Sequence, residues 1–387
     1  MAWAAAGETF NLASVPTKQR LLFTPKKDGG QGLRGTVLTP AGEKKVRAGG
    51  TPELSDYSTS AKALQTFASK SELAQALLDH AKFGKLRTTY TRPYLGGDRT
   101  RQRGNKEATE WVESRVVDGR IHTRYIQSRV ETGRLSSKEP NLMNVPSRSE
   151  EGKKIRDLFI ATHGYTLVQA DYSQIEPRII ADLSGDPTML ETYRSGGDIY
   201  LTVADKLGVD RNTGKTLVLA IAYGIGPAAI AESNDMTKTQ AQELMSFFRK
   251  QFPRIDRHKR VVLSSALKHI PPYTETVLGR RRYLPGLKSR DEATVAYSQR
   301  QAYNHVIQGS AADVMKLALV RIRKMLPDYG RMLLTVHDEI VTEVPHQYVD
   351  ETVEIVRQAM ESVGDRWFAV PLVADVKVAD RWGGCKD

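Results

Sequence analysis

The sequence predicts an α+β protein in which a helical N-terminal arm precedes a sheet that a long helical insertion interrupts. Apolar residues recur at helical spacing within residues 61–81, and a short apolar strand covers residues 167–170. Two apolar runs, 332–336 and 340–344, flank a polar tip in the pattern of a β-hairpin. Strands on both sides of a mainly helical stretch indicate that the chain leaves the sheet and returns to it.

The chain is long enough for two or three subdomains and carries an excess of positive charge. It has 387 residues, of which 40% are hydrophobic and 26% charged, and its formal net charge is +12. This composition is ordinary for a folded globular protein, which excludes disorder, collagen-like structure and repeat arrays as the main state. The positive charge points to a polyanionic partner, and nucleic acid is the first candidate.

Several classes of protein are excluded by the sequence. The single cysteine, Cys385, excludes an intrachain disulfide framework and a cysteine-based zinc site, and it favours a reducing compartment. No run approaches the ~20 apolar residues of a membrane span, and the first residues lack the basic and apolar regions of a signal peptide. We therefore expect a cytoplasmic protein that does not bind membranes.

The N-terminal arm is expected to combine one helix with basic loops. Leucine and phenylalanine residues give residues 61–81 an apolar helical face. The stretches 24–51 and 92–106 are rich in glycine and basic residues and are expected to form mobile loops. Such an arm is suited to hold a nucleic-acid backbone, although a solvated basic surface explains these residues equally well.

The middle of the chain begins with a strand and a helix. The strand of residues 167–170 ends at Asp171, and residues 173–176 have the form of a capping box that opens a helix. Residues 237–240 have the same form and are expected to open a helix that ends before Pro253.

Two carboxylates, Asp171 and Asp338, stand at the ends of predicted apolar strands. A carboxylate is costly to bury there unless it is paired with a cation. If folding brings the two together, they can hold two Mg²⁺ ions, one at the attacking and one at the leaving oxygen of a phosphoryl transfer. Taken singly, each aspartate is better explained as a cap of a strand or turn.

A second group of residues follows the spacing of one helix face. Arg211, Lys215, Leu219 and Tyr223 are each four residues apart, and Gly224 then predicts a tight turn. Arg211 and Lys215 suit the phosphates of a nucleotide, and Lys215 is placed to protonate a pyrophosphate leaving group. Leu219 and Tyr223 suit the sugar and the base. The alternative is an amphipathic helix whose charged end is solvated.

These residues lie in strings that resemble the motifs of the family A DNA polymerases, the bacterial DNA polymerase I type. Residues 171–178 resemble motif A of that family, residues 211–224 resemble motif B, and residues 336–339 resemble motif C. Three further strings support the resemblance, and all six occur in the family's order. These strings are residues 132–146, 279–285 and 308–313.

The resemblance implies a right-hand polymerase fold with thumb, palm and fingers, in which an antiparallel sheet forms the palm. It implies an N-terminal segment and thumb in residues 1–125, a palm in 126–185 and 301–387, and fingers in 186–300. The implied activity is that of a DNA-directed DNA polymerase, which adds dNTPs to a primer 3′ end by two-metal phosphoryl transfer. The implied cofactors are two Mg²⁺ ions, with Mn²⁺ as a substitute, and the implied partners of this monomer are primer–template DNA and dNTPs.

The roles of the family's residues carry over by match. The resemblance assigns Asp171 and Asp338 to metal binding and catalysis, with Glu339 assisting the metals and Lys215 also catalytic. Glu176 is implied as the steric gate that crowds a ribose 2′-OH, and Tyr223 as the neighbour of the templating base. The residues implied in dNTP binding are Arg211, Lys215, Leu219, Tyr223, Gln174, Glu176 and Tyr200. The residues implied in DNA binding are Arg134, Arg300, Asn304, Gln308 and His337.

Three positions depart from the family's pattern. Leu219 stands where the family usually has Phe or Tyr, so we expect discrimination against dideoxynucleotides to differ from that of an aromatic-bearing relative. Pro177 replaces the usual Leu after the gate, early enough in its helix to be tolerated. Tyr200 replaces a phosphate-contacting His, and a phenol brings no charge at neutral pH, so triphosphate binding should depend more on Arg211 and Lys215.

The polymerase match begins near residue 1, so no proofreading exonuclease is expected from this chain, and a separate exonuclease or processivity partner is an open alternative. A bacterial cell or a phage-infected host is the expected location, and an organelle stays open.

Three other functions compete with the polymerase. A two-metal nuclease needs no helix for a triphosphate, a single-subunit RNA polymerase would prefer rNTPs, and an inactive nucleic-acid-binding clamp would bind DNA without extending it.

Overall fold

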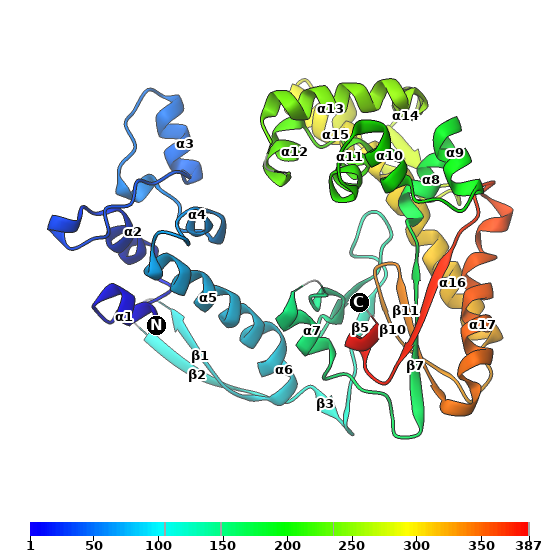
Figure 1. Ribbon diagram of the computed structural model, residues 1–387, viewed down its shortest axis with the longest axis horizontal. Coiled ribbons are helices and arrows are strands. Elements are labelled where there is room, and N and C mark those ends of the chain that lie inside the picture. Colours follow the sequence, from blue (N-terminus) through cyan, green and yellow to red (C-terminus); the bar gives the residue numbers. More distant parts are fainter. Residues whose placement is uncertain (104–105, 148, 235, 386–387) are drawn as a thin grey trace. The chain divides into compact units, whose positions relative to one another are not determined.

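The computed structural model describes residues 1–103, 106–147, 149–234 and 236–385, and the chain divides into two units, Met1–His122 and Thr123–Asp387 (Figure 1). The first unit is mainly helical. The second unit holds a four-stranded antiparallel sheet together with most of the long helices. This mixture confirms the predicted α+β fold class.

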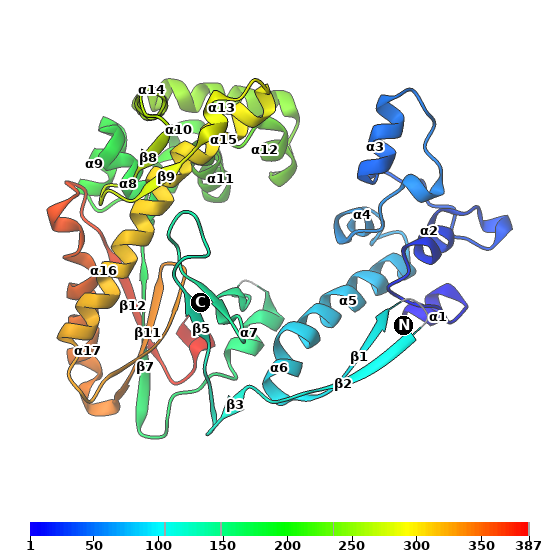
Figure 2. The same ribbon diagram turned by 180° about the vertical axis from the view of Figure 1, so that it is seen from behind.

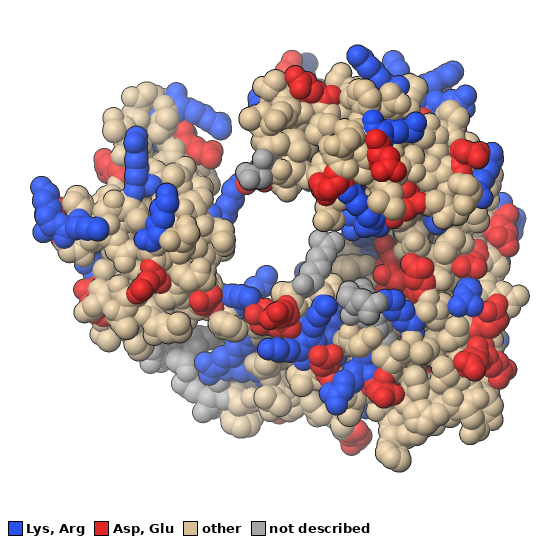
Figure 3. Space-filling view, viewed as in Figure 1, with Lys and Arg blue, Asp and Glu red and all other residues tan. Residues whose placement is uncertain are grey.

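The core of the N-terminal unit forms where α5, Glu72–Leu86, packs against α1, Ala2–Ala6, and α4, Ala61–Gln65. Buried Leu73 and Leu77 of α5 lie in this core. Lys and Arg side chains project from the unit around α2 and α3 (Figure 3). Its other elements are α2 Val15–Phe23, α3 Pro40–Arg47, α6 Arg92–Leu95, the pair β1 Gly97–Arg103 and β2 Lys106–Val112, the pair β3 Val116–Val117 and β4 Arg120–Ile121, and the short turns η1 Lys26–Asp28, η2 Leu54–Asp56 and η3 Arg87–Thr91.

This unit corrects the sequence prediction in three places. Residues 61–81 form parts of two helices instead of one, because Ser60 and Ser71 each accept a backbone N–H and so begin a new helix. Residues 24–51 are largely exposed, but they include helix α3. Residues 92–106 hold α6 and β1 instead of a loop, because β1 pairs with β2 along its length; residues 104–105 lie outside the described residues.

The sheet of the second unit joins segments that are far apart in the sequence. Its strands are β7 Tyr165–Tyr172, β10 Arg331–Val336, β11 Glu339–Pro345 and β12 Ala374–Ala379, in the order β10-β11-β7-β12. All neighbouring strands are antiparallel. The predicted hairpin is confirmed as β10 and β11, and the predicted strand 167–170 lies within β7, between β11 and β12.

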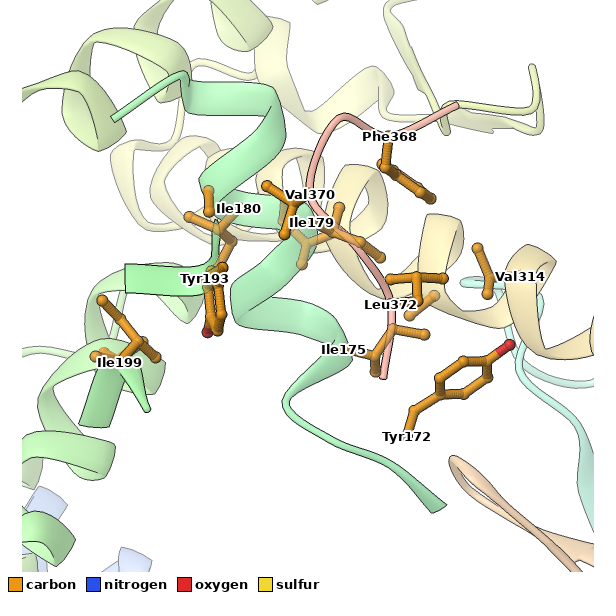
Figure 4. Packing of buried hydrophobic residues seen from close by; sticks show 14 of the residues in the cluster. Tyr172, Ile175, Ile179, Ile180, Tyr193, Ile199, Val314, Phe368, Val370 and Leu372 are labelled. Carbon is orange, nitrogen blue, oxygen red and sulfur yellow. The ribbon is translucent and has the colours of Figure 1, made fainter. Parts of the chain in front are cut away.

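The two faces of this sheet have different roles. On one face, Val168 and Ala170 of β7 lie in the main core with α16, Ser310–Met325, and α17, Val349–Glu361. Figure 4 shows Ile175 and Ile179, from the helix after β7, packed with Val370 and Leu372 from the segment before β12. Since side chains alternate along a strand, Asp171 points to the opposite face.

The helical insertion follows β7 and ends at α16. Its predicted capping box is confirmed, because Thr237 accepts the backbone N–H of Gln240 and Gln240 accepts that of Thr237. The helices are α8 Ile175–Ser184, α9 Pro187–Arg194, α10 Ile199–Leu207, α11 Arg211–Tyr223, α12 Pro227–Ser233, α13 Lys238–Gln251, α14 Pro253–Leu267 and α15 Glu292–Asn304. A π-helical turn, η6 His305–Gly309, joins α15 to α16, and a short antiparallel pair, β8 Tyr273–Glu275 and β9 Arg281–Tyr283, precedes α15.

Smaller elements complete the second unit. They are β5 Arg124–Ile126, β6 Ser136–Lys138, α7 Glu150–Arg156 and the short turns η4 Leu142–Asn144, η5 Pro285–Lys288, η7 His346–Tyr348, η8 Gly364–Arg366 and η9 Trp382–Cys385. In the described part of the chain, no helix combines the length and the apolar character needed to cross a bilayer.

Candidate active site

The sheet brings Asp171 and Asp338 together at one end. Asp171 is the penultimate residue of β7 and pairs in register with Glu339, the first residue of β11. The carbonyl of Asp338, in the tight turn before β11, accepts the backbone N–H of Tyr172 at 3.1 Å. His337 turns the chain here with a left-handed backbone, φ +57°, and its side chain is exposed. Two aspartates from distant parts of the sequence therefore become neighbours.

Glu339 lies beneath this pair and is held from two sides. Its side chain is 1% exposed; Oε1 accepts the indole N–H of Trp382 at 2.6 Å, and Oε2 lies 3.6 Å from a terminal nitrogen of Arg156. The Arg156 guanidinium also lies 4.1 Å from the centre of the Trp382 ring. Burial lowers the pKa of Arg156, while the charges of Glu339 and Asp171 oppose that shift. This buried cluster supports the strand ends that carry the two aspartates.

Glu176 occupies a different environment from the one that the capping box implied. The capping residue of α8 is Gln174, which has a left-handed backbone, φ +54°, and no side-chain cap, so the prediction of a capping box at residues 173–176 is wrong. The Gln174 amide oxygen instead accepts the hydroxyl of Tyr193 at 3.1 Å. The carboxylate of Glu176 forms an ion pair with Arg134, so a tertiary partner replaces the local one. Pro177 lies in the first turn of α8, where proline is tolerated.

The ionisation of Glu176 is shifted toward neutral pH. Burial and, to a smaller extent, the charge of Asp338 raise its pKa to about 7 against the opposing charge of Arg134. The Glu176 carboxylate is therefore within electrostatic reach of one of the two aspartates and changes its charge near physiological pH.

Helix α11 carries the predicted stripe of residues on a partly exposed face. Its buried face packs on α10 through Gly214, where an added Cβ would lie 2.5 Å from the carbonyl oxygen of Tyr200. Arg211 is exposed, and Lys215, Leu219 and Tyr223 are partly buried along the helix. The predicted helix and its face are confirmed.

Tyr200 links the cations of α11 to the carboxylates of the sheet. Its ring centre lies 5.4 Å from the guanidinium carbon of Arg211 and 5.8 Å from Nζ of Lys215. Burial, together with the negative charges of Glu176, Asp198 and Asp338, raises the pKa of the phenol to about 12 against the opposing charge of Arg211. Arg211 and Lys215, which suit a phosphate, and the strand-end carboxylate of Asp338 therefore all act on the side chain of Tyr200.

In this structure Arg211 has a partner of its own. It donates two hydrogen bonds to Oδ2 of Asp198, at 3.0 Å from Nε and 2.6 Å from a terminal nitrogen. The other oxygen of Asp198 caps α10 by accepting the N–H of Tyr200. Arg211 is thus held in place without a substrate by a half-exposed ion pair.

The residues implied in DNA binding fall in two places of this unit. Arg300, Asn304 and Gln308 follow one another on successive turns of α15 and η6. Arg134 and His337 line a small cavity of about 20 Å³ beside Asp338; its remaining lining residues are Leu135, Met143, Ala312, Met315 and Lys316.

The three arginines of residues 280–282 each pair with a carboxylate. Arg280 pairs with Asp313 at 2.6 Å, Arg281 with Glu275 at 2.6 Å, and Arg282 with Glu131. They are therefore not a freely solvated run. Arg280 also packs against Gly133, next to Arg134, so this string of the sequence supports the backbone that carries Arg134.

Sequence reasoning missed several residues of this site. Arg156 and Trp382 carry no local signal, because their role depends on a buried contact with Glu339. Asp375 of β12 pairs in register with Asp171, so a further carboxylate stands on the neighbouring strand. The sequence patterns predicted no strand over residues 374–379, so they did not indicate this carboxylate.

The carboxylates suit a divalent metal whose remaining ligands come from a phosphate-bearing substrate. No group of three or more His, Cys, Asp or Glu side chains in the described segments is arranged to hold a metal by itself. Mg²⁺ is commonly bound by one or two carboxylates together with substrate phosphates. Asp171 and Asp338 can supply the carboxylates, and Arg211 and Lys215 of α11 are cations that suit the phosphates of such a substrate.

An antiparallel sheet with carboxylates paired at its end, in one unit with a helix that carries a cationic stripe, is the arrangement that the six sequence strings implied. The chain belongs to DNA polymerase family A, whose family model matches residues 1–384. This confirms the resemblance that the six sequence strings indicated. Polymerases of this family generally use divalent metal ions.

The comparisons with individual proteins agree with this assignment. The chain is 34% identical over 391 residues to DNA polymerase I of Chloroflexus aurantiacus, a match that covers 97% of this chain and 38% of that protein. It is 33% identical over 392 residues to the thermostable DNA polymerase I of Thermus aquaticus, covering 99% and 43%. The chain thus spans about two fifths of the length of these curated relatives.

A solved structure also resembles the fold. It is the POL domain of Pol1 from M. smegmatis in complex with a DNA primer-template and dNTP, with a TM-score of 0.81 and 33% sequence identity. The match covers 99% of this chain and 63% of that one. The expected polymerase fold is therefore confirmed.

Proposed function

We propose that this chain is a template-directed DNA polymerase domain that adds dNTPs to the 3′ end of a primer. The observation that carries the proposal is the environment of Tyr200, where Arg211 and Lys215 of α11 meet the charges of Glu176 and Asp338. A triphosphate on these cations would hold its reacting phosphorus beside the strand-end carboxylates. The family membership of the chain supports the same function.

Asp171 and Asp338 would hold two Mg²⁺ ions, or Mn²⁺ as a substitute. When bound, the metal supplies a lowered pKa for the primer 3′-hydroxyl and stabilises charge on the departing pyrophosphate. Arg211 and Lys215 bind the triphosphate, and Lys215 donates a proton to the leaving group. We place Glu339 beneath the two aspartates as a support, because Trp382 and Arg156 already engage its carboxylate.

The remaining residues position the sugar, the base and the DNA. Glu176 is the gate against a ribose 2′-OH, with Gln174 and Leu219 near the sugar and Tyr223 beside the templating base. The residues that contact the primer–template are Arg134, Arg300, Asn304, Gln308 and His337. Tyr200 donates one hydrogen bond to the triphosphate.

The proposed parts of the polymerase follow the sequence. Residues 1–125 hold the N-terminal segment and thumb, 126–185 and 301–387 the palm, and 186–300 the fingers. The division of the chain between His122 and Thr123 supports the first boundary. We further propose that the chain acts as a monomer in the cytoplasm of a bacterial or phage-infected cell; the relatives that it matches are bacterial DNA polymerases I.

The test is primer extension on a DNA template with Mg²⁺, in which dNTPs are compared with rNTPs and the wild type with Asp338→Asn. We expect dNTP incorporation that depends on the template, with rNTPs used far less, because the buried Glu176 lies close to Asp338. The Asp338→Asn variant should lose extension and keep primer–template binding. Efficient extension by this variant would refute the metal assignment, and preferred use of rNTPs would indicate an RNA polymerase.

A further inference from the structure

Two cations from different helices converge on the turn that ends α11. Gly224 ends this helix with a left-handed backbone, φ +65°. A Cβ added at Gly224 would lie 2.9 Å from Cγ of Arg300 and 3.4 Å from Nζ of Lys259. Arg300 comes from α15 and Lys259 from α14, and α15 contacts both α11 and α14 (Figure 2).

Within the described part of the chain, neither of these two cations forms a salt bridge with a carboxylate. Asp256 lies one turn before Lys259 on α14, but its carboxylate pairs with Arg249 at 3.4 Å. Burial lowers the pKa of Lys259, and the positive charges of Arg249 and Arg300 lower it further, while Asp256 opposes the shift. The structure thus holds an ammonium group partly away from water and close to another cation, an arrangement that an anionic ligand would stabilise.

The backbone of α11 supplies only part of the missing negative charge. The C-terminal end of a helix corresponds to about half a negative charge, whereas Lys259 and Arg300 bring two positive charges. The turn is also open, because a Cβ at Gly226 would meet no atom within 4 Å and Ile225 is 40% exposed. A ligand with one negative charge can therefore reach the two cationic side chains from the open side of this turn and balance their remaining charge.

The position of the turn decides between two sources of phosphate. Arg211, the proposed triphosphate ligand, stands at the other end of α11, and twelve helical rises of 1.5 Å separate it from Tyr223 by about 18 Å. A triphosphate bound there does not reach Gly224. Tyr223, the proposed neighbour of the templating base, directly precedes this glycine. The nearer source is therefore the backbone of the template strand.

We propose that Lys259 and Arg300 together bind one backbone phosphate of the template strand at the turn after α11. This inference rests on the proposed function, and it adds Lys259 and the phosphate to a region where Arg300 was expected to contact DNA. The contact holds the strand where it passes Tyr223, so that the templating base is presented at a fixed distance from the incoming nucleotide.

The experiment measures binding of primer–template DNA by wild type, Lys259→Met and Lys259→Arg at several salt concentrations. Lys250→Met, which removes an exposed cation from α13, is the matched control. Each protein binds a duplex with a single-stranded template extension and the same duplex with blunt ends. Thermal unfolding of each variant reports whether the fold is intact, and dNTP extension by the wild type tests the proposed function separately.

We expect Lys259→Met to weaken binding of the extended template about tenfold at moderate salt. The slope of log affinity against log salt should become shallower by about 0.7, the value for one single-stranded phosphate contact. Blunt duplex binding should not change, and Lys259→Arg should keep the wild-type slope. In a further experiment, single template phosphates are replaced with uncharged methylphosphonates. At one linkage this replacement should lower the affinity of the wild type to that of Lys259→Met.

Two results would overturn the proposal. If Lys259→Met lowers the unfolding temperature but leaves the salt slope unchanged, Lys259 only stabilises the end of α11. If the affinity falls equally for blunt and extended DNA, the contact is to the duplex and not to the template strand at the active site. Either result can be obtained from an enzyme that extends primers normally.

Discussion

The carboxylate end of the sheet and the stripe of α11 are proposed to serve one site, yet the molecule holds them in different ways. Asp171 and Asp338 are fixed by backbone pairing, and the support below them, Glu339 with Arg156, is almost fully buried. Arg211 and Lys215 lie on a partly exposed helix face, and the ion pair of Arg211 with Asp198 is accessible to solvent. The side chains that support the two aspartates are therefore buried, whereas the cations of α11 lie near water.

The largest effect should follow from a change on the exposed side. Lys215→Met removes the proposed proton donor, so kcat should fall by about 10²–10⁴-fold. The unfolding temperature should hardly change, because the side chain lies on the partly exposed face of α11. Steady-state kinetics and thermal unfolding measure the two effects, with Lys206→Met on α10 as the matched control. A large loss of stability with unchanged kcat would show that Lys215 supports the fold and not the reaction, which contradicts the proposed difference between the stripe of α11 and the buried cluster.

The buried side should respond through stability. Arg156→Met leaves Glu339 buried without its cation, and unfolding should become easier by about 3–5 kcal/mol. Because replacing both members of a buried pair is often nearly neutral, Arg156→Met combined with Glu339→Gln should recover most of this loss. Denaturant unfolding of the two single variants and the double variant gives the coupling energy. Additive losses would show that the pair contributes nothing as a unit.

The ion pair of Glu176 with Arg134 is more exposed than the buried pair of Arg156 with Glu339 and less exposed than that of Arg211 with Asp198. Its strength should depend on pH. The pKa of Glu176 is raised to about 7, so the carboxyl is mostly neutral at pH 6 and mostly charged at pH 8. The neutral form holds Arg134 less tightly, and the arginine is then free for DNA. The loss of primer–template affinity on Arg134→Ala should therefore be several-fold larger at pH 6 than at pH 8. In a Glu176→Gln background this pH dependence should disappear; if it persists, another group titrates.

The smallest effect is expected at Leu219. This side chain is partly buried on α11, between Lys215 and Tyr223, where the sugar of the nucleotide is proposed to lie. Leu219→Phe should change the dideoxy:deoxy incorporation ratio and leave primer–template affinity almost unchanged, because residue 219 is proposed to face the sugar of the nucleotide and not the DNA. Competitive incorporation assays measure the ratio, with Leu201→Phe on α10 as the control. An unchanged ratio would mean that residue 219 does not affect sugar recognition.

Local patterns predicted the helices and strands best where the fold did not overrule them. The four-residue spacing of Arg211 to Tyr223, the capping box at residues 237–240 and the hairpin of 332–344 all occur as expected. The capping box at residues 173–176 does not, because Glu176 finds a stronger partner in Arg134, far away in the sequence. The single helix of residues 61–81 divides, because Ser71 begins a second one.

The fold class, the family resemblance and the candidate site residues could be predicted from the sequence, since these depend on residue type, order and local spacing. Which distant groups meet could be read only from the folded chain. Strand register placed Glu339 and Asp375 on either side of Asp171. Side-chain packing brought Arg156 beneath Glu339 and Lys259 against Gly224. The physical reason is that such contacts join residues far apart in the chain through burial and backbone pairing, and neither leaves a periodic signal in the sequence.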